Sequence, residues 1–416
     1  MLTHYLSLAV KVLLRRKFFT FISLFGISFT LLVLTVVTAL FDHTFGPDTT
    51  EPYQGRSLYV ERAVMYGPHS TMSSSGGFKL FDRYARDLPG VERLSLYENG
   101  HTVHSYLDGR KISSKLKRTD DQFWKILTFT FLEGGPYGAA DVAEARPVAV
   151  INARTRERFF GTGSAVGQTL EADGQRFHVS GVVEDVSEAR TVPFAEIWVP
   201  YTTAKTDAYK REVIGDWNAV ALARDTAAMP GIHEEFNSRL ARVELPDPTH
   251  YQAIVAPFET KFQAFAREVN VGDRKDPESQ VWQLVGWLSL LCLLFVLIPT
   301  VNLVNINISR IMERASEIGV RKAFGAPART LVGQFLLENV LLTLLGALGG
   351  FLLSMLTLRM LERSGVFAYA RFTLNPRVFA YGVTLAVLFG LVSGVYPAWR
   401  MSRLNPVDAL KGGASR

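Results

Sequence analysis

Four long apolar runs dominate the pattern of hydrophobic and polar positions along this chain. They lie at 18–41, 281–308, 331–358 and 378–399, and Glu338 is the only charged residue within them. Each run has at least the roughly 20 residues that a helix needs to cross the hydrocarbon core of a bilayer. The pattern predicts a multi-pass α-helical membrane protein with four transmembrane helices.

The long polar stretch 42–280, between the first and second runs, shows the shorter periods of a folded domain. Asp108-Gly109 and Asp173-Gly174 each separate two strand-like runs, which is the usual signal of a β-hairpin. Other runs alternate like strands or place apolar residues on one helical face. The predicted strands are Ser57–Val64, Arg93–Tyr97, Val148–Ile151 and Trp217–Ala223, and the predicted helices are Phe78–Leu88, a segment ending at Phe160, and Ile232–Ala241. We therefore expect a large α+β domain inserted between helices 1 and 2.

The basic residues predict which side of the membrane each segment faces. They cluster in 1–17, 309–330 and 400–416, at the ends of apolar runs. By the positive-inside rule these three segments are cytoplasmic, so both termini lie inside and the domain 42–280 lies outside. The net charge of +6 therefore indicates membrane topology, and we find no nucleic-acid-binding motif. The short outer loop 359–377 carries four arginines against this rule, which suggests contact with lipid headgroups or with the domain.

The segment 309–330 has features of a docking surface. Glu317 and Arg321 stand four residues apart in the favourable order, and Val320 and Phe324 form an apolar spot at the same spacing. Gly325 then ends the predicted helix. A solvated loop that only obeys the topology rule would need none of these features, so we interpret the segment as a contact for another protein.

Three stretches resemble one known family. Residues 317 to 326, Glu-Ile-Gly-Val-Arg-Lys-Ala-Phe-Gly-Ala, resemble the signature of FtsX/MacB-type ABC transporter permeases. Pro147–Val183 looks like the extracytoplasmic core domain of MacB-type permeases. The tail Arg400–Lys411 resembles the C-terminal sequence that is common in that family. In the family the signature segment is the coupling helix that contacts the ATPase subunit. The resemblance implies these coupling residues: Glu313, Arg314, Glu317, Ile318, Gly319, Val320, Arg321, Lys322, Phe324 and Gly325.

Polar and small residues within the apolar runs are candidates for contacts between helices. Asn302 and Asn305 either hold helices together or mark the membrane interface. For Glu338 we favour pairing at the interface over a role in proton transfer. Gly346, together with Gly349 and Gly350, allows close approach of another helix.

The chain lacks the motifs of an enzyme. No phosphate-binding P-loop sequence occurs, so ATP and Mg²⁺ are expected on a separate ATPase and no cofactor on this chain. No metal-binding motif is present, His101 and His104 are expected at the surface, and Cys292 is the single cysteine. We expect neither catalytic residues nor a metal site.

The resemblance implies a permease subunit in a bacterial inner membrane that transmits ATP-driven motion to its periplasmic domain. One coupling motif per chain implies two copies, or a pair with a close relative, bound to two P-loop ATPase subunits, with membrane lipid and a periplasmic adaptor as further partners. The expected process is efflux of an amphiphile, drug or peptide. Lipoprotein release and control of cell-wall hydrolases are alternatives within the family, and a membrane-anchored sensor or adaptor without ATPase coupling is the alternative from another class.

Overall fold

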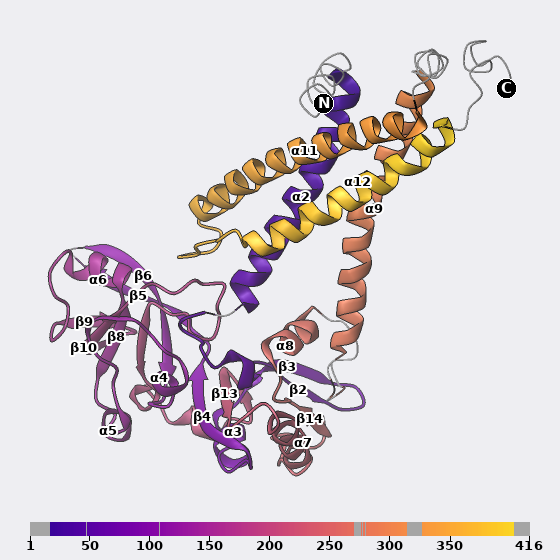
Figure 1. The fold of residues 1–416 in the computed structure, drawn as a ribbon. Coiled ribbons are helices and arrows are strands. Elements are labelled where there is room, and N and C mark those ends of the chain that lie inside the picture. The colour runs from indigo at the N-terminus through magenta and orange to yellow at the C-terminus, as the bar shows by residue number, and fades with distance from the viewer. Residues whose placement is uncertain are drawn as a thin grey trace. The chain divides into compact units, whose positions relative to one another are not determined.

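The computed structural model describes residues 17–46, 48–107, 109–269, 276, 278, 280–313 and 327–402, which form two compact units (Figure 1). The helical unit comprises the chain up to His43, Gly286–Val366 and the chain from Arg371. The sheet unit comprises Thr44–Val285 and Phe367–Ala370. Each unit is described by itself.

Among its described residues, the helical unit has four long helices at the positions of the four apolar runs. They are α2 (Lys17–Phe45), α9 (Val281–Glu313), α11 (Ala328–Ser364) and α12 (Pro376–Ser402), of which α11 and α12 pack side by side (Figure 1). Among the described residues, Thr20–Phe45 and Leu336–Ser364 are long and apolar enough to cross a membrane, and Val281–Phe295 and Pro376–Leu388 are shorter apolar stretches.

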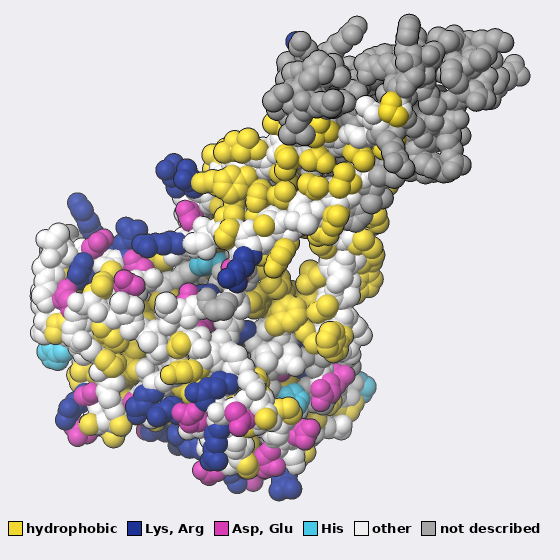
Figure 2. All heavy atoms as spheres, viewed as in Figure 1, with side chains coloured by type: hydrophobic (Ala, Val, Ile, Leu, Met, Phe, Trp, Pro, Cys, Tyr) yellow, Lys and Arg dark blue, Asp and Glu magenta, His cyan; other side chains and the backbone are white. Residues whose placement is uncertain are grey.

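On the face shown in Figure 2, hydrophobic side chains cover much of the described part of the helical unit, and charged side chains are spread over the sheet unit. On α11, Leu344, Leu348, Leu352 and Leu356 are exposed at a spacing of one helical turn. Soluble proteins rarely expose apolar stripes of this kind, and a lipid environment accounts for them.

The sheet unit holds a 14-stranded sheet and six short α-helices, and is of the α+β class. Its strands are β1 (Ser57–Val60), β2 (Ala63–Tyr66), β3 (Thr71–Gly76), β4 (Val91–Glu98), β5 (His101–Leu107), β6 (Arg110–Thr119), β7 (Phe131–Gly134), β8 (Val148–Asn152), β9 (Thr169–Ala172), β10 (Gln175–Val183), β11 (Ile197–Pro200), β12 (Ile214–Gly215), β13 (Trp217–Ala223) and β14 (Ala253–Val255). Its helices are α3 (Phe78–Tyr84), α4 (Phe123–Ile126), α5 (Ala139–Ala143), α6 (Ala153–Phe160), α7 (Met229–Leu240) and α8 (Lys261–Glu268).

The strand order along the sheet is β14-β2-β3-β13-β4-β6-β11-β8-β10-β7, and most neighbours are antiparallel. The pairs β6–β11 and β8–β10 are parallel. Three buried clusters fill the unit: one packs α3 and α7 on β13, one is rich in aromatic rings around α4 and β11, and one lies around β8 and β10. The described part of the domain therefore has three hydrophobic cores, which lie along one continuous sheet.

Local sequence signals identified several of these elements correctly. The two predicted hairpins are present as β5–β6 and β9–β10, and Asp173 and Gly174 adopt the positive φ angles that the tight turn requires. The prediction of a single strand over Ser57–Val64 is wrong. The chain there forms β1, which pairs with β13, and β2, which pairs with β3 and β14, with a break at Glu61-Arg62. Both strands are buried almost throughout, so the alternation did not reflect one exposed face.

Candidate functional site at the junction of helix α2 and the sheet unit

Most of the predicted coupling residues lie outside the described residues. Glu313 is the last residue of α9, and the other nine, from Arg314 to Gly325, fall in the range 314–326. Asn302 and Asn305 lie on α9, and Glu338 is buried on α11. The contacts described below lie within one unit at a time, at the α2–α11 packing and at the end of α2.

Helices α2 and α11 pack closely through small residues. A Cβ atom at Gly346 would lie 2.8 Å from the side chain of Ile27, and one at Gly350 would lie 2.9 Å from that of Leu31. The hydroxyl of Ser28 also donates a hydrogen bond to the Gly346 carbonyl, at 2.8 Å. The prediction that these glycines admit another helix is confirmed, and that helix is α2.

The last residue of α2 packs on helix α8 of the sheet unit. The Phe45 ring makes edge contacts with Phe262 and Phe265, with ring centroids 5.9 and 5.1 Å away. The Gln54 side chain donates a hydrogen bond to the Phe45 carbonyl, at 3.0 Å. The end of α2 is thus held against α8 within the sheet unit.

A buried ion cluster fixes the backbone just after α2. Arg190 pairs with Glu51, at 3.1 Å, and with Asp48, at 3.3 Å, and donates a hydrogen bond to the Gly46 carbonyl, at 3.1 Å. Lys261 at the start of α8 also pairs with Glu51. Both Arg190 and Glu51 are buried, and removal of one partner from such a pair leaves an uncompensated charge. The cluster therefore holds the exit of α2 and the start of α8 together.

The outer loop between α11 and α12 docks on the same part of the sheet unit. The Glu188 amide donates a hydrogen bond to the Ala368 carbonyl, at 2.9 Å, and the Tyr369 hydroxyl donates one to Glu196. Tyr369 has a φ of 60°, a left-handed conformation that is uncommon for an aromatic residue. These contacts come from a backbone carbonyl and from Tyr369, so they do not explain the four arginines of the loop.

Arg190, Glu188 and Glu196 all belong to one connection, Glu184–Glu196, which links β10 to β11 and which we call the junction segment. The ammonium group of Lys117 on β6 donates to the carbonyls of Thr191 and Val192 of this segment, both at 2.7 Å. Burial lowers the pKa of Lys117 to about 7. The junction segment thus contacts the α2 exit, the outer loop and the sheet.

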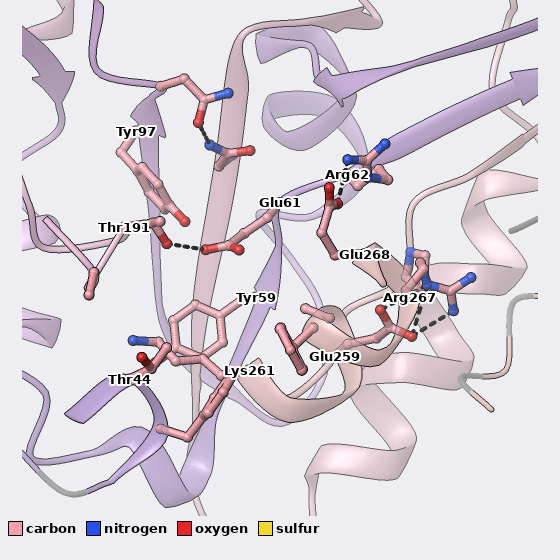
Figure 3. Close-up of a pocket in the computed structure, with 17 residues that line it drawn as sticks. Thr44, Tyr59, Glu61, Arg62, Tyr97, Thr191, Glu259, Lys261, Arg267 and Glu268 are labelled. Atoms are coloured by element: carbon pink, nitrogen blue, oxygen red, sulfur yellow. Dashed lines mark hydrogen bonds and ion pairs between the residues drawn. The ribbon is translucent and has the colours of Figure 1, made fainter. Parts of the chain in front are cut away.

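A cavity of about 350 Å³ lies beside the junction segment, with Thr191 in its wall (Figure 3). Glu61, in the break between β1 and β2, reaches into it, and burial raises the pKa of this carboxyl. Within the described ranges no three His, Cys, Asp or Glu side chains are grouped so that they could hold a metal ion. His104 lies exposed on β5 and contacts Ser113.

Two family profiles match this chain. Residues 20–239 match the profile described as MacB-like periplasmic core domain, and residues 289–406 match the one described as FtsX-like permease C-terminal. The chain belongs to the MacB/FtsX family of membrane permeases. The sheet unit of this MacB/FtsX permease is its periplasmic domain, and the family resemblance seen in the sequence is confirmed.

Relatives with curated names are similar at low identity. The macrolide export ATP-binding/permease protein MacB of Pasteurella multocida is 25% identical over 303 residues, which cover 72% of this permease and 43% of the relative. The pyoverdine export ATP-binding/permease protein PvdT of Pseudomonas entomophila is 26% identical over 422 residues, covering 97% of this permease and 59% of the relative. This MacB/FtsX permease thus spans about half the length of the curated relatives it matches.

The periplasmic region of MacB from Actinobacillus actinomycetemcomitans is a similar solved structure, with a TM-score of 0.35 and 14% identity. The match covers 46% of this permease and 88% of that chain. The extracellular domain of the transporter YknZ from Gram-positive bacteria gives a TM-score of 0.37, 14% identity, and coverage of 47% and 97%.

The sequence interpretation missed the contacts that the junction segment of this permease makes. Glu51 and Arg190 are 139 residues apart, and Tyr369 and Glu196 are 173 residues apart, so no local spacing joins them. The only available signal was the placing of single charged residues, such as Glu196, directly beside apolar strands. That signal marks a buried charge without naming its partner.

Proposed function

We propose that this chain is the permease subunit of an ABC transporter, and that it passes motion driven by ATP hydrolysis to its periplasmic domain. The observation that carries the proposal is that α2 packs on α11 in the helical unit, while its last residue, Phe45, packs on α8 in the sheet unit. ATP and Mg²⁺ bind a separate P-loop ATPase, whose two copies contact two copies of this chain or one copy and a close relative. The chain itself is then not an enzyme.

The route of the motion follows from the contacts. A shift of the coupling residues, 313–325, moves α11, because the two are adjacent in the chain. Tight packing at Gly346 and Gly350 passes the shift to α2, since close-packed helices cannot slide without moving their neighbour. The aromatic contact of Phe45 and the ion cluster of Arg190 then pass it to the periplasmic domain.

We place the chain in a bacterial inner membrane with four spans, α2, α9, α11 and α12, and with both termini in the cytoplasm. The exported substrate is an amphiphilic small molecule, drug or peptide, handed to a periplasmic adaptor. The names of the relatives describe export of macrolides and of pyoverdine, which favours efflux over lipoprotein release or control of cell-wall hydrolases.

The coupling segment gives the direct test. Phe324→Ala should weaken docking of the ATPase by about 1–3 kcal/mol, the usual range for an aromatic anchor at an interface. Arg321→Glu should add repulsion with Glu317. The measurements are co-purification of the ATPase with the permease in nanodiscs and the stimulated rate of ATP hydrolysis.

Tyr106→Ala, in an exposed position of the periplasmic domain, is the matched control and should change neither quantity. Equal co-purification and equal stimulation for the wild type and both coupling variants would reduce the segment to a topological loop and reject the proposal.

A further inference from the structure

The cavity beside the junction segment lies wholly within the periplasmic domain. Its walls come from the end of α2, the break between β1 and β2, strands β4 and β13, helix α8, and Thr191 (Figure 3). Its volume of about 350 Å³ falls in the range of pockets that hold small organic ligands. The transport route proposed above makes no use of it.

The cations around the cavity already have carboxylate partners. Arg267 pairs with Glu259, with Nη2 and Oε1 2.6 Å apart. Arg62 pairs with Glu268. Lys261 pairs with Glu51, a residue that does not line the cavity. Figure 3 shows the first two pairs on the α8 side of the cavity.

Glu61 is the exception among the acidic groups of the cavity. Over the ranges that the structure describes, its carboxylate forms no ion pair and accepts only a long hydrogen bond from Thr191 Oγ1, at 3.4 Å. Lys261 and Lys117 lie close enough to Glu61 to lower its pKa, but Lys261 pairs with Glu51 and Lys117 is held by two backbone carbonyls. A half-buried carboxylate without a direct ion pair favours a cation that enters the cavity.

Tyr97 supplies a second, independent sign of a ligand. Its side chain is 1% exposed, and its hydroxyl finds no hydrogen-bond partner among the residues that the structure includes. The ring lines the cavity on the same side as Glu61 and Thr191 (Figure 3). Buried hydroxyl groups are nearly always hydrogen-bonded, so this group calls for a partner that enters the cavity.

The remaining walls are suited to an apolar body. The rings of Phe45, Phe265 and Tyr59 line the cavity beside Glu61. Aromatic faces attract organic ammonium ions and also cover the carbon groups attached to them. A carboxylate, a free hydroxyl and several rings together select a cationic amphiphile over a neutral or an anionic one.

We propose that this cavity binds an organic ammonium ion, with the charged nitrogen between Glu61 and the Tyr97 hydroxyl and the apolar body against Phe45 and Phe265. The amine headgroup of a lipid and a free amphiphilic amine share this chemistry. The site does not depend on coupling to an ATPase, so Phe324→Ala should leave binding unchanged.

Isothermal titration calorimetry on the full chain in phosphatidylglycerol nanodiscs tests the site, with empty nanodiscs as the blank. Phenylbutylamine, phenylbutanol and phenylbutyrate share one apolar body and differ in charge. The amine should bind at least about tenfold more tightly than the alcohol, because it pairs with a carboxylate shielded from water, and the acid should bind least.

Two variants remove one group each without changing its shape. Glu61→Gln should weaken amine binding at least about tenfold and leave alcohol binding unchanged, and Tyr97→Phe should weaken amine binding about threefold to tenfold, the loss expected for one hydrogen bond. Glu157→Gln, at an exposed site on α6, is the matched control for charge. Melting temperatures of the variants show whether each still folds.

Nanodiscs that contain phosphatidylethanolamine show whether the ligand is the amine headgroup of a lipid or a free amine. If lipid amines fill the cavity, they should compete and weaken phenylbutylamine binding in the wild type but not in Glu61→Gln. If the ligand is a free amine, the two lipid compositions should give equal affinity. Equal binding of all three probes, or a folded Glu61→Gln variant that binds the amine as tightly as the wild type, would overturn the proposal.

Discussion

Asp120 shows how a single buried carboxylate organises the periplasmic domain. It accepts hydrogen bonds from the Ser95 hydroxyl at 2.7 Å, the Leu96 amide at 2.9 Å and the Phe123 amide at 3.0 Å. Burial raises its pKa to about 6, although these three hydrogen bonds act in the opposite direction. One side chain thus joins strand β4 to the start of α4.

Asp120→Ala should destabilise the domain by about 2–4 kcal/mol, because two buried amides lose their acceptor. Asp120→Asn keeps one acceptor oxygen and should cost clearly less. Chemical denaturation followed by tryptophan fluorescence measures both, since Trp124 lies in α4 and packs against the aromatic cluster around it. Equal stability of the alanine and asparagine variants would show that the hydrogen bonds contribute little.

Lys117 should make the stability of the domain depend on pH. Its pKa is about 7 in the folded protein, against an ordinary value of 10.5. Between these values the unfolded chain binds more protons than the folded protein, so the contribution of Lys117 to the free energy of unfolding rises with pH. Below about pH 7 both states are protonated and this dependence ends.

Lys117→Met should therefore show a smaller rise in stability between about pH 7 and pH 10 than the wild type. Lys111→Met, at an exposed position, should retain the wild-type slope. Denaturation midpoints measured across this pH range decide the matter, and identical slopes for wild type and Lys117→Met would contradict the argument.

The contact between α2 and α11, which we call the seam, determines how closely these two helices pack. Gly346 and Gly350 are spaced as in the small-xxx-small pattern that brings membrane helices together. The pattern itself could be found in the sequence. Its partner could not, because Ser28 and Leu31 lie more than three hundred residues away and nothing in their spacing marks them.

Gly350→Val should disrupt this seam, because a Cβ atom there would lie 2.9 Å from Leu31 and 3.0 Å from the Ser28 carbonyl. The expected loss of stability is about 1–3 kcal/mol, as for other overpacked sites. Gly333→Val, on the same helix but with nothing within 4 Å, is the matched control. Thermal unfolding in detergent compares the two variants. Equal melting temperatures would mean that the helices adjust to the larger side chain without loss of stability.

Local chemistry explains which elements the sequence predicted. The turn at Asp173-Gly174 depends only on neighbours in the chain. The parallel pairing of β6 with β11 and the contact of Arg190 with Glu51 depend on the whole fold. The fold class and the family could therefore be predicted from the sequence. The contacts of the junction segment and the cavity beside it could not.

The topology of the whole molecule can be tested by labelling. In a Cys292→Ala background, which removes the native thiol, a cysteine in place of Ser73 should react with an impermeant reagent from outside, because this position is exposed on β3. A cysteine in place of Ser316 should react only after the membrane is opened. Labelling of the second position in intact cells would contradict the placing of the coupling segment in the cytoplasm.

The docked outer loop has a mechanical consequence. The periplasmic domain is attached through α2, through the chain from α8 to α9, and through Phe367–Ala370. One chain connection lets a domain rotate freely, whereas three connections restrict that rotation. Under the proposed function, flexible residues inserted between Ser364 and Phe367 should therefore leave ATP hydrolysis by the ATPase unchanged and reduce export.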